Sequence, residues 1–204
     1  MAETPSSAFD RPPARIVLAT ANAGKHAELV GLLAGRIEVL ARPPEIPEVV
    51  EDAGTLAGNA RLKARSIVAA TGEVALADDT GLEVDALEGR PGVDTSSFGG
   101  VDHDDDRNIA RLLLELRGVP PAQRTARFRT VLVLVAPDGR ELVTEGVVEG
   151  TVAEKRSGVE GFGYDPVFVP DEGDGRTFAR MTRAEKSAIS HRGRALRALV
   201  AALG

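Results

Sequence analysis

Apolar residues along the chain come in two patterns, short unbroken runs and sets with helical spacing. The runs RIVLAT (15–20) and EVALAD (73–78) predict two short buried strands, and residues 82–84 leave room for another. Leucines recur every three or four residues within KHAELVGLL (25–33), and the apolar residues of 56–70 have the same period. These two stretches are therefore predicted to be helices that each bury one face.

The second half of the chain continues this alternation. Three acids at 104–106 lead into NIARLLLELRG, and acids are typical of a helix start because they interact favourably with the helix dipole. Residues 128–154 predict strands around a turn at 137–139, Pro-Asp-Gly. A single last helix is expected over 183–203, preceded by a T-x-x-E capping box at 182–185. Strands and helices in this order favour an α/β fold with a mixed sheet.

Composition narrows the class of protein. The 204 residues suit one domain, predicted to span 15–204 after a disordered extension at 1–14 that is rich in Pro and Ser. The chain has no cysteine, which excludes disulfides and thiol chemistry. No apolar run is long enough to cross a membrane, and the first residues lack the apolar core of a signal peptide. We therefore expect a cytoplasmic protein without a membrane partner.

Charge is distributed unevenly. The net charge of −6 disfavours a general nucleic-acid-binding protein. From Arg176 onward, however, seven Lys and Arg residues stand against one acid, Glu185. A basic end on an acidic protein suits a small anionic ligand, and a solvated basic helix is the alternative.

The stretch TANAGK, Thr20 to Lys25, joins a predicted strand to a predicted helix. Free N–H groups at a helix start together with a lysine make an anion site. It is not a Walker P-loop, because residue 19 is Ala and residue 26 is His where that motif needs Gly and Ser or Thr. Taken alone, the stretch favours an ordinary strand-to-helix turn with a surface lysine.

Two adjacent carboxylates, Asp78 and Asp79, end the second apolar run in LADDTGL. Ligands gather at the carboxyl ends of strands in open α/β sheets, and a metal ion would relieve the repulsion between close acids. Successive side chains point to opposite faces of a strand, so one carboxylate is expected to face the site. A polar turn capping the strand is the alternative. Glu51 is a further candidate metal ligand, or else a solvated loop acid.

Two stretches near the end stand out. GFGYDPVFVP (161–170) holds three of the chain's seven aromatic rings beside an acid, between glycines and prolines that fit neither a helix nor a regular strand. EKSAISHRGRAL (185–196) places His191, Arg192 and a glycine on the last helix. Lone His and Arg residues on helices are usually structural or solvated, so the second stretch alone does not indicate a site.

Taken together and in order, the stretches resemble the motifs of the inosine triphosphate pyrophosphatase family. The matching stretches are LATANAGK, NARLKA, ADDTGLEV with GRPGV, GFGYDPVF and EKSAISHRGRAL, which span residues 16 to about 196. The resemblance implies Mg²⁺-dependent hydrolysis of non-canonical purine nucleoside triphosphates (ITP, dITP, XTP) to the monophosphate and pyrophosphate. A pyrophosphatase for other modified nucleotides and a non-catalytic nucleotide-binding regulator are the alternatives.

The resemblance also implies a structure. It predicts an elongated α/β fold with a central mixed sheet and flanking helices, two lobes around a nucleotide-binding cleft, and a homodimer. Asp79 and Lys25 match the catalytic positions, and Asp79 with Glu51 matches the metal ligands. The positions that match substrate contacts are Thr20, Ala21, Asn22, Ala23, Gly24, Lys25, Thr80, Phe162, Gly163, Tyr164, Asp165, Lys186, His191 and Arg192. Among these, Arg192 can only donate and Asp165 can only accept hydrogen bonds, which fits a 6-oxo purine with its N1–H.

Overall fold

The computed structural model describes residue 9 and residues 11–204. The predicted extension at 1–14 therefore falls largely outside the described residues, because 1–8 and 10 are not among them. Phe9 is only 5% exposed, and the guanidinium of Arg140 lies 5.4 Å from its ring centroid.

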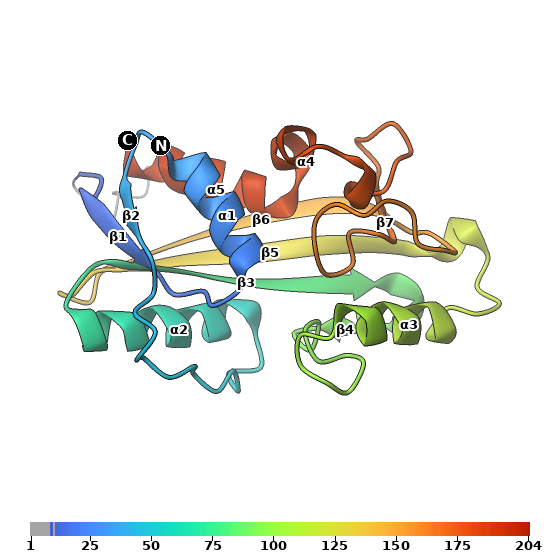
Figure 1. Ribbon diagram of the computed structural model, residues 1–204, viewed down its shortest axis with the longest axis horizontal. Helices are drawn as coiled ribbons and strands as arrows, with labels where there is room; N and C mark the ends of the chain where they lie inside the picture. The colour runs from blue at the N-terminus through green and yellow to red at the C-terminus, as the bar shows by residue number, and fades with distance from the viewer. Residues whose placement is uncertain (1–8, 10) are drawn as a thin grey trace, which may run out of the picture. The chain divides into compact units, whose positions relative to one another are not determined.

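The described chain forms a mixed α/β structure (Figure 1). The strands are β1 Arg15–Leu18, β2 Glu38–Leu40, β3 Ala75–Val84, β4 Pro91–Gly92, β5 Thr125–Val135, β6 Glu141–Val152 and β7 Phe168–Pro170. The helices are α1 Ala23–Leu33, α2 Leu56–Thr71, α3 Asp105–Glu115, α4 Arg183–Ile189 and α5 His191–Leu203. The strands pair in the order β2-β1-β3-β5-β6-β7, with β4 beside β3. β1 is parallel to β2 and β3, while β3–β4 and β6–β7 are antiparallel, which confirms the predicted mixed sheet.

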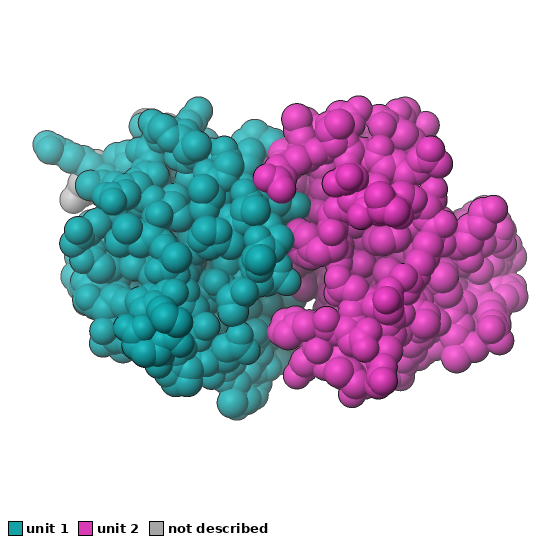
Figure 2. All heavy atoms as spheres, viewed as in Figure 1, with its two compact units in different colours: residues 1–79, 131–145, 195–204 teal, residues 80–130, 146–194 magenta. Residues whose placement is uncertain are grey.

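The chain divides into two compact units, coloured teal and magenta in Figure 2. Unit 1 consists of residues 1–79, 131–145 and 195–204, and unit 2 of residues 80–130 and 146–194. The division falls within β3, β5 and β6, so each of these strands contributes residues to both units.

Unit 1 is built in three layers. On one face of its strands, leucines of α1 and α5 pack against Ile16, Leu76 and Leu132. On the other face, α2 packs its small and branched residues against the alternate positions of the same strands. Figure 1 shows the same arrangement, with α1 and α5 on one side of the strands and α2 on the other. A sheet covered on both faces explains why its strands read as unbroken apolar runs.

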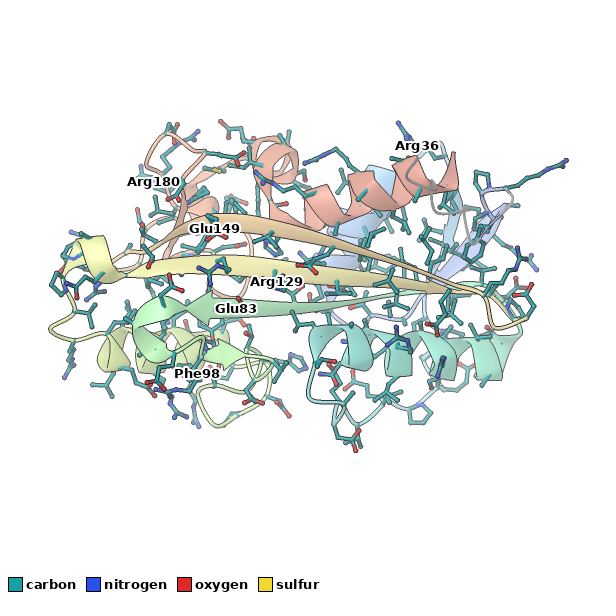
Figure 3. All side chains as sticks on the ribbon, turned by 180° about the vertical axis from the view of Figure 1, so that it is seen from behind. Arg36, Glu83, Phe98, Arg129, Glu149 and Arg180 are labelled. Atoms are coloured by element: carbon teal, nitrogen blue, oxygen red, sulfur yellow. The ribbon has the colours of Figure 1, made fainter. Side chains whose placement is uncertain are left out.

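Unit 2 is organised around one apolar cluster that joins α3 to the strands and to the aromatic segment after β6. Phe168 is fully buried, and its ring centroid lies 4.7 Å from that of Phe128. Charged side chains of β3, β5 and β6 pair across the strands of this unit, as at Arg129 Nε and Glu83 Oε1, 3.0 Å apart (Figure 3). Figure 3 also labels Glu149 on β6, whose Oε2 lies 3.1 Å from Arg127 Nε. Such partly exposed pairs each contribute little, so the apolar cluster is the main source of stability.

Two sequence-based predictions of element boundaries are wrong. The acids Asp78 and Asp79 do not end a strand, because β3 continues through both of them to Val84. The last element is not one helix, because the backbone of Ser190 is extended (φ −69°, ψ 156°) and separates α4 from α5. The predicted capping box at Thr182 and Glu185 is confirmed at the start of α4. Over the part of the chain that the structure describes, no helix combines the length and apolar character that a membrane crossing needs.

Candidate active site

The start of α1 has the features expected for an anion site. Asn22 caps the helix, its Oδ1 accepting from the backbone N–H of Lys25 at 3.0 Å, and the N–H of Asn22 itself donates to Thr20 Oγ1 at 3.2 Å. Ala21 and Ala23 are exposed, so the first turn of the helix is open to solvent. The predicted segment from Thr20 to Lys25 thus forms a capped, accessible helix N-terminus with positive partial charge.

Asp78 and Asp79 have different lysine partners. Lys25 Nζ of α1 lies 3.2 Å from Asp78 Oδ2, whose side chain is fully buried. Lys63 Nζ of α2 lies 2.9 Å from Asp79 Oδ1. Since α1 and α2 cover opposite faces of the strands, the two carboxylates point to opposite faces, as the alternation along a strand requires.

Asp79 is held by two residues of α2. Besides the contact with Lys63, Asp79 Oδ2 accepts a hydrogen bond from Asn59 Nδ2 at 3.3 Å. Lys63 Nζ also donates to Glu51 Oε2 at 3.0 Å. Glu51 and Asp79, the two predicted metal ligands, therefore converge on one cation, and in this structure that cation is the ammonium group of Lys63.

Burial and charge act against each other in this cluster. Burial raises the pKa of Asp79, and the nearby charges of Lys63 and Lys25, which lower it, do not fully offset that effect. Burial lowers the pKa of Lys63, but the carboxylates of Asp79, Asp78 and Glu51 outweigh it and the net shift is upward. Three carboxylates share two ammonium groups, so these five side chains carry one negative charge in excess when all are ionised.

The donor chemistry of the cluster fits a hard divalent cation. Carboxylate oxygens are the ligands that Mg²⁺ prefers in proteins, and here two of them already face one position. Mg²⁺ usually needs only one or two protein carboxylates, because water and substrate phosphates supply the rest. Among the described residues, no group of three or more His, Asp or Glu side chains is gathered for a metal. Asp79 and Glu51 are therefore the residues that could hold Mg²⁺, at the position that the Lys63 ammonium occupies here.

In unit 2, the segment GFGYDP folds around the carboxylate of Asp165. Asp165 Oδ2 accepts from the backbone N–H of Phe162 at 3.0 Å and from Lys186 Nζ at 2.6 Å. Gly161 has φ +79°, and a Cβ there would collide with the Asp165 carboxylate. The N–H of Gly163 donates to Asp105 Oδ2 at the start of α3, at 2.6 Å. The glycines and acids thus fix the loop that presents Phe162.

Two cations lie near the Phe162 ring. Lys186 Nζ is 4.7 Å and Arg192 Cζ 5.5 Å from its centroid, within the range of cation–π interactions. The Arg192 guanidinium also donates to Thr80 Oγ1 at 3.2 Å. Phe162 is partly exposed, whereas Lys186 and Arg192 are 6% and 1% exposed. Unit 2 therefore places Lys186 and Arg192 beside the Phe162 ring, with Thr80 held by Arg192.

Tyr164 and His191, also predicted to contact the substrate, are buried. The Tyr164 hydroxyl donates to the Thr95 carbonyl at 3.0 Å, and burial raises the pKa of this phenol. The His191 ring stacks on Phe128 with centroids 4.6 Å apart and an interplanar angle of 17°. Both side chains are at most 3% exposed, so in this structure they support the site from within the protein.

Asn59 and Lys63 are not among the site residues that the sequence predicted. They lie four residues apart on α2 and so share one face of the helix, the face directed at Asp79. That spacing of two polar residues within an otherwise apolar stripe was the available signal. Their partners lie 20 and 16 residues away in the chain, a distance that periodicity alone does not relate.

Comparison with known proteins identifies the family of the chain. The profile described as the Ham1 family matches residues 16–202. The chain is 52% identical over 197 residues to a dITP/XTP pyrophosphatase of Nitratidesulfovibrio vulgaris, covering 92% of this chain and 94% of the relative. It is 46% identical to a dITP/XTP pyrophosphatase of Corynebacterium efficiens, covering 93% and 97% of the two chains.

Solved structures give the same result. A HAM1 protein from Coxiella burnetii has a TM-score of 0.83 at 38% identity, covering 93% of this chain and 98% of that one. A nucleoside-triphosphatase or dITP/XTP pyrophosphatase from Mycobacterium abscessus has a TM-score of 0.73 at 44% identity, covering 91% and 98%. The resemblance inferred from the sequence motifs is confirmed, and the chain belongs to the Ham1 family.

Proposed function

We propose that the protein hydrolyses non-canonical purine nucleoside triphosphates, ITP, dITP and XTP, to the monophosphate and pyrophosphate. The observation that carries the proposal is on β3, where the buried carboxylate of Asp79 contacts Lys63 and Asn59. The next residue in the chain, Thr80, accepts a hydrogen bond from Arg192. The dITP/XTP pyrophosphatase names of relatives that match nearly the whole chain support the reaction class.

Each group has a role in this reaction. The α1 N-terminus with Lys25 binds the triphosphate, because the N–H groups of its open first turn and the nearby ammonium both attract an anion. Asp79 accepts the proton of the attacking water as that water bonds to the α-phosphorus and the bond to pyrophosphate breaks. Mg²⁺ held by Asp79 and Glu51 would neutralise charge on the phosphates and orient them. Phe162 stacks on the purine, and Arg192 donates to its 6-oxo group.

The test is product analysis with ITP, dITP, XTP, ATP and GTP in the presence of Mg²⁺. We expect equimolar monophosphate and pyrophosphate, fastest with the first three substrates. Release of orthophosphate and a nucleoside diphosphate would show that a different bond is cleaved, and the absence of any product would favour a binding protein.

The cleft, the homodimer and the cytoplasmic location, which were expected from the sequence, stay predictions.

Lys63 offers a test of the metal site that does not depend on turnover. Lys63→Met removes the ammonium between Asp79 and Glu51, and breaking such a buried pair costs about 3–5 kcal/mol of stability. Because the two carboxylates then lose the ammonium between them, Mg²⁺ should raise the melting temperature of this variant more than that of the unchanged protein.

The matched control for this experiment is Arg61→Met, also on α2. Arg61 Nε pairs with Glu141 Oε2 at 2.8 Å, but its side chain is 34% exposed, so the loss should stay below about 1 kcal/mol. Its melting temperature should respond to Mg²⁺ as the unchanged protein does. Equal Mg²⁺ effects on Lys63→Met and Arg61→Met would argue against a metal site at Asp79 and Glu51.

A further inference from the structure

We infer that Thr130 is a positioning residue for base selection, acting through Thr80 on Arg192. This inference rests on the proposed function, in which Arg192 reads the 6-oxo group of the purine. Thr130 lies on β5, in unit 2 together with Thr80 and Arg192. Neither the sequence motifs nor the family resemblance drew attention to it.

The first observation is that Thr130 is a polar residue in an apolar row. On the same face of β5, Ala126, Phe128 and Leu132 are all buried and apolar, and Thr130 among them is 0% exposed. A buried hydroxyl without a hydrogen bond is costly, and valine has almost the same shape. A threonine at this position therefore needs a reason in its hydrogen bonding.

The second observation is its partner. Thr130 Oγ1 lies 2.7 Å from Thr80 Oγ1, and Thr80 Oγ1 in turn accepts from the Arg192 guanidinium at 3.2 Å. Arginine has no acceptor, so Thr80 must offer a lone pair to Arg192. Whichever hydroxyl donates in the Thr80–Thr130 contact, that contact holds Thr80 Oγ1 in the orientation that Arg192 uses.

The third observation is that β5 supports both residues of the His191–Arg192 pair. Phe128 stacks on the His191 ring. Thr130 is two residues further along the same face of β5. It contacts Thr80, which accepts a hydrogen bond from Arg192. The stacking holds His191 and the hydrogen bonds hold Arg192, so two contacts from one strand fix this pair of neighbouring residues at the start of α5. Thr130 thus sets where the guanidinium points, and thereby how well it distinguishes a 6-oxo from a 6-amino purine.

The test compares Thr130→Val with Thr130→Ser. Valine places a methyl group against Thr80 Oγ1 at a distance that suits two oxygens, whereas carbon and oxygen need about 3.3 Å or more. Serine keeps the hydroxyl. The readout is the ratio of dissociation constants for AMP and IMP from calorimetry, alongside the ratio of kcat/KM for ITP and ATP.

We expect Thr130→Val to lower the preference for IMP over AMP by roughly three- to tenfold, the effect of losing one hydrogen bond. Thr130→Ser should keep the preference within about twofold. Thr130→Ala, which cannot push Thr80 aside by steric contact, should lose it as valine does and serves if the valine variant does not fold. An unchanged preference in the folded valine and alanine variants, or an equal loss in the serine variant, would overturn the inference.

A matched control is Thr144→Val. Thr144 Oγ1 donates a hydrogen bond directly to α5, to the Ala195 carbonyl at 2.9 Å, and does not contact Arg192 or Thr80 in that bond, so its loss should leave the preference unchanged. A shift as large as that of Thr130→Val would mean that any hydroxyl lost beside α5 has this effect, which would contradict a specific role. The binding ratio is measured on monophosphates and needs no turnover. Failure of the inference is therefore distinguishable from failure of the proposed reaction.

Discussion

Asp79→Asn is expected to leave a folded protein with turnover reduced by at least roughly a hundredfold. Asparagine keeps the shape of the side chain and one oxygen that can accept from Lys63, while its amide nitrogen faces the Asn59 donor, so the variant loses some stability but keeps its fold. Asparagine cannot take a proton from water, and it is a poorer ligand for a divalent cation. Either loss alone is expected to reduce turnover by roughly a hundredfold. The measurement is kcat for ITP, with thermal unfolding to confirm the fold. Near-normal turnover in a folded variant would remove Asp79 from the chemistry.

Asp78→Asn is the matched control one residue away. Asp78 pairs with Lys25 on the opposite face of β3, so its loss should loosen the lysine that binds the triphosphate. We expect a smaller effect, and mainly in KM. A loss of kcat as large as that of Asp79→Asn would instead point to Asp78, or to the pair acting as one unit.

The regular elements were predictable because one physical signal determines them. The helix expected over 56–70 is α2, Leu56–Thr71, and the expected turn at 137–139 joins β5 to β6. In both cases the apolar period and the capping or turn residues agree, and tertiary contacts reinforce what the local sequence prefers.

The continuation of β3 through Asp78, Asp79 and Gly81 was not predictable in the same way. Acids and glycine disfavour strands, so the local signal indicates a turn. The segment is extended because β3 lies inside the sheet, with β1 and β5 as neighbours in the strand order. Lysines from two helices neutralise the acids that this placement buries. Both conditions depend on contacts distant in sequence.

The break between α4 and α5 is the opposite case, because the sequence predicted a continuous helix and the structure interrupts it. Apolar residues keep helical spacing across residues 183–203, which indicates one helix. Ser190 instead accepts from the N–H of Gly193 at 3.2 Å and begins a second helix, a cap signal that the periodicity hides. The break has a consequence for the site, because it places His191 and Arg192 in the first turn of α5 rather than in the middle of a longer helix.

Asp165 and Arg192 were expected to share the reading of the base, but their contacts suggest separate roles. Asp165 is 2% exposed, and its Oδ2 already accepts from Lys186 and from the backbone of Phe162. Its carboxylate therefore holds the loop and the lysine in place. Arg192 has guanidinium donors beside Phe162 and Thr80, where a stacked purine would present its edge.

Arg192→Ala is accordingly expected to lower the ratio of kcat/KM for ITP over ATP by roughly ten- to a hundredfold. A 6-oxo purine loses a charge-assisted hydrogen bond in this variant, whereas a 6-amino purine, itself a donor at that position, loses none. Asp165→Asn should slow both substrates and keep their ratio, because a displaced Phe162 loop weakens stacking on either base. Arg192→Lys, which keeps the charge without the planar fork, should fall between the unchanged protein and the alanine variant. If Arg192→Ala slows ITP and ATP equally, the guanidinium positions the nucleotide without reading its base, and selection must come from another residue.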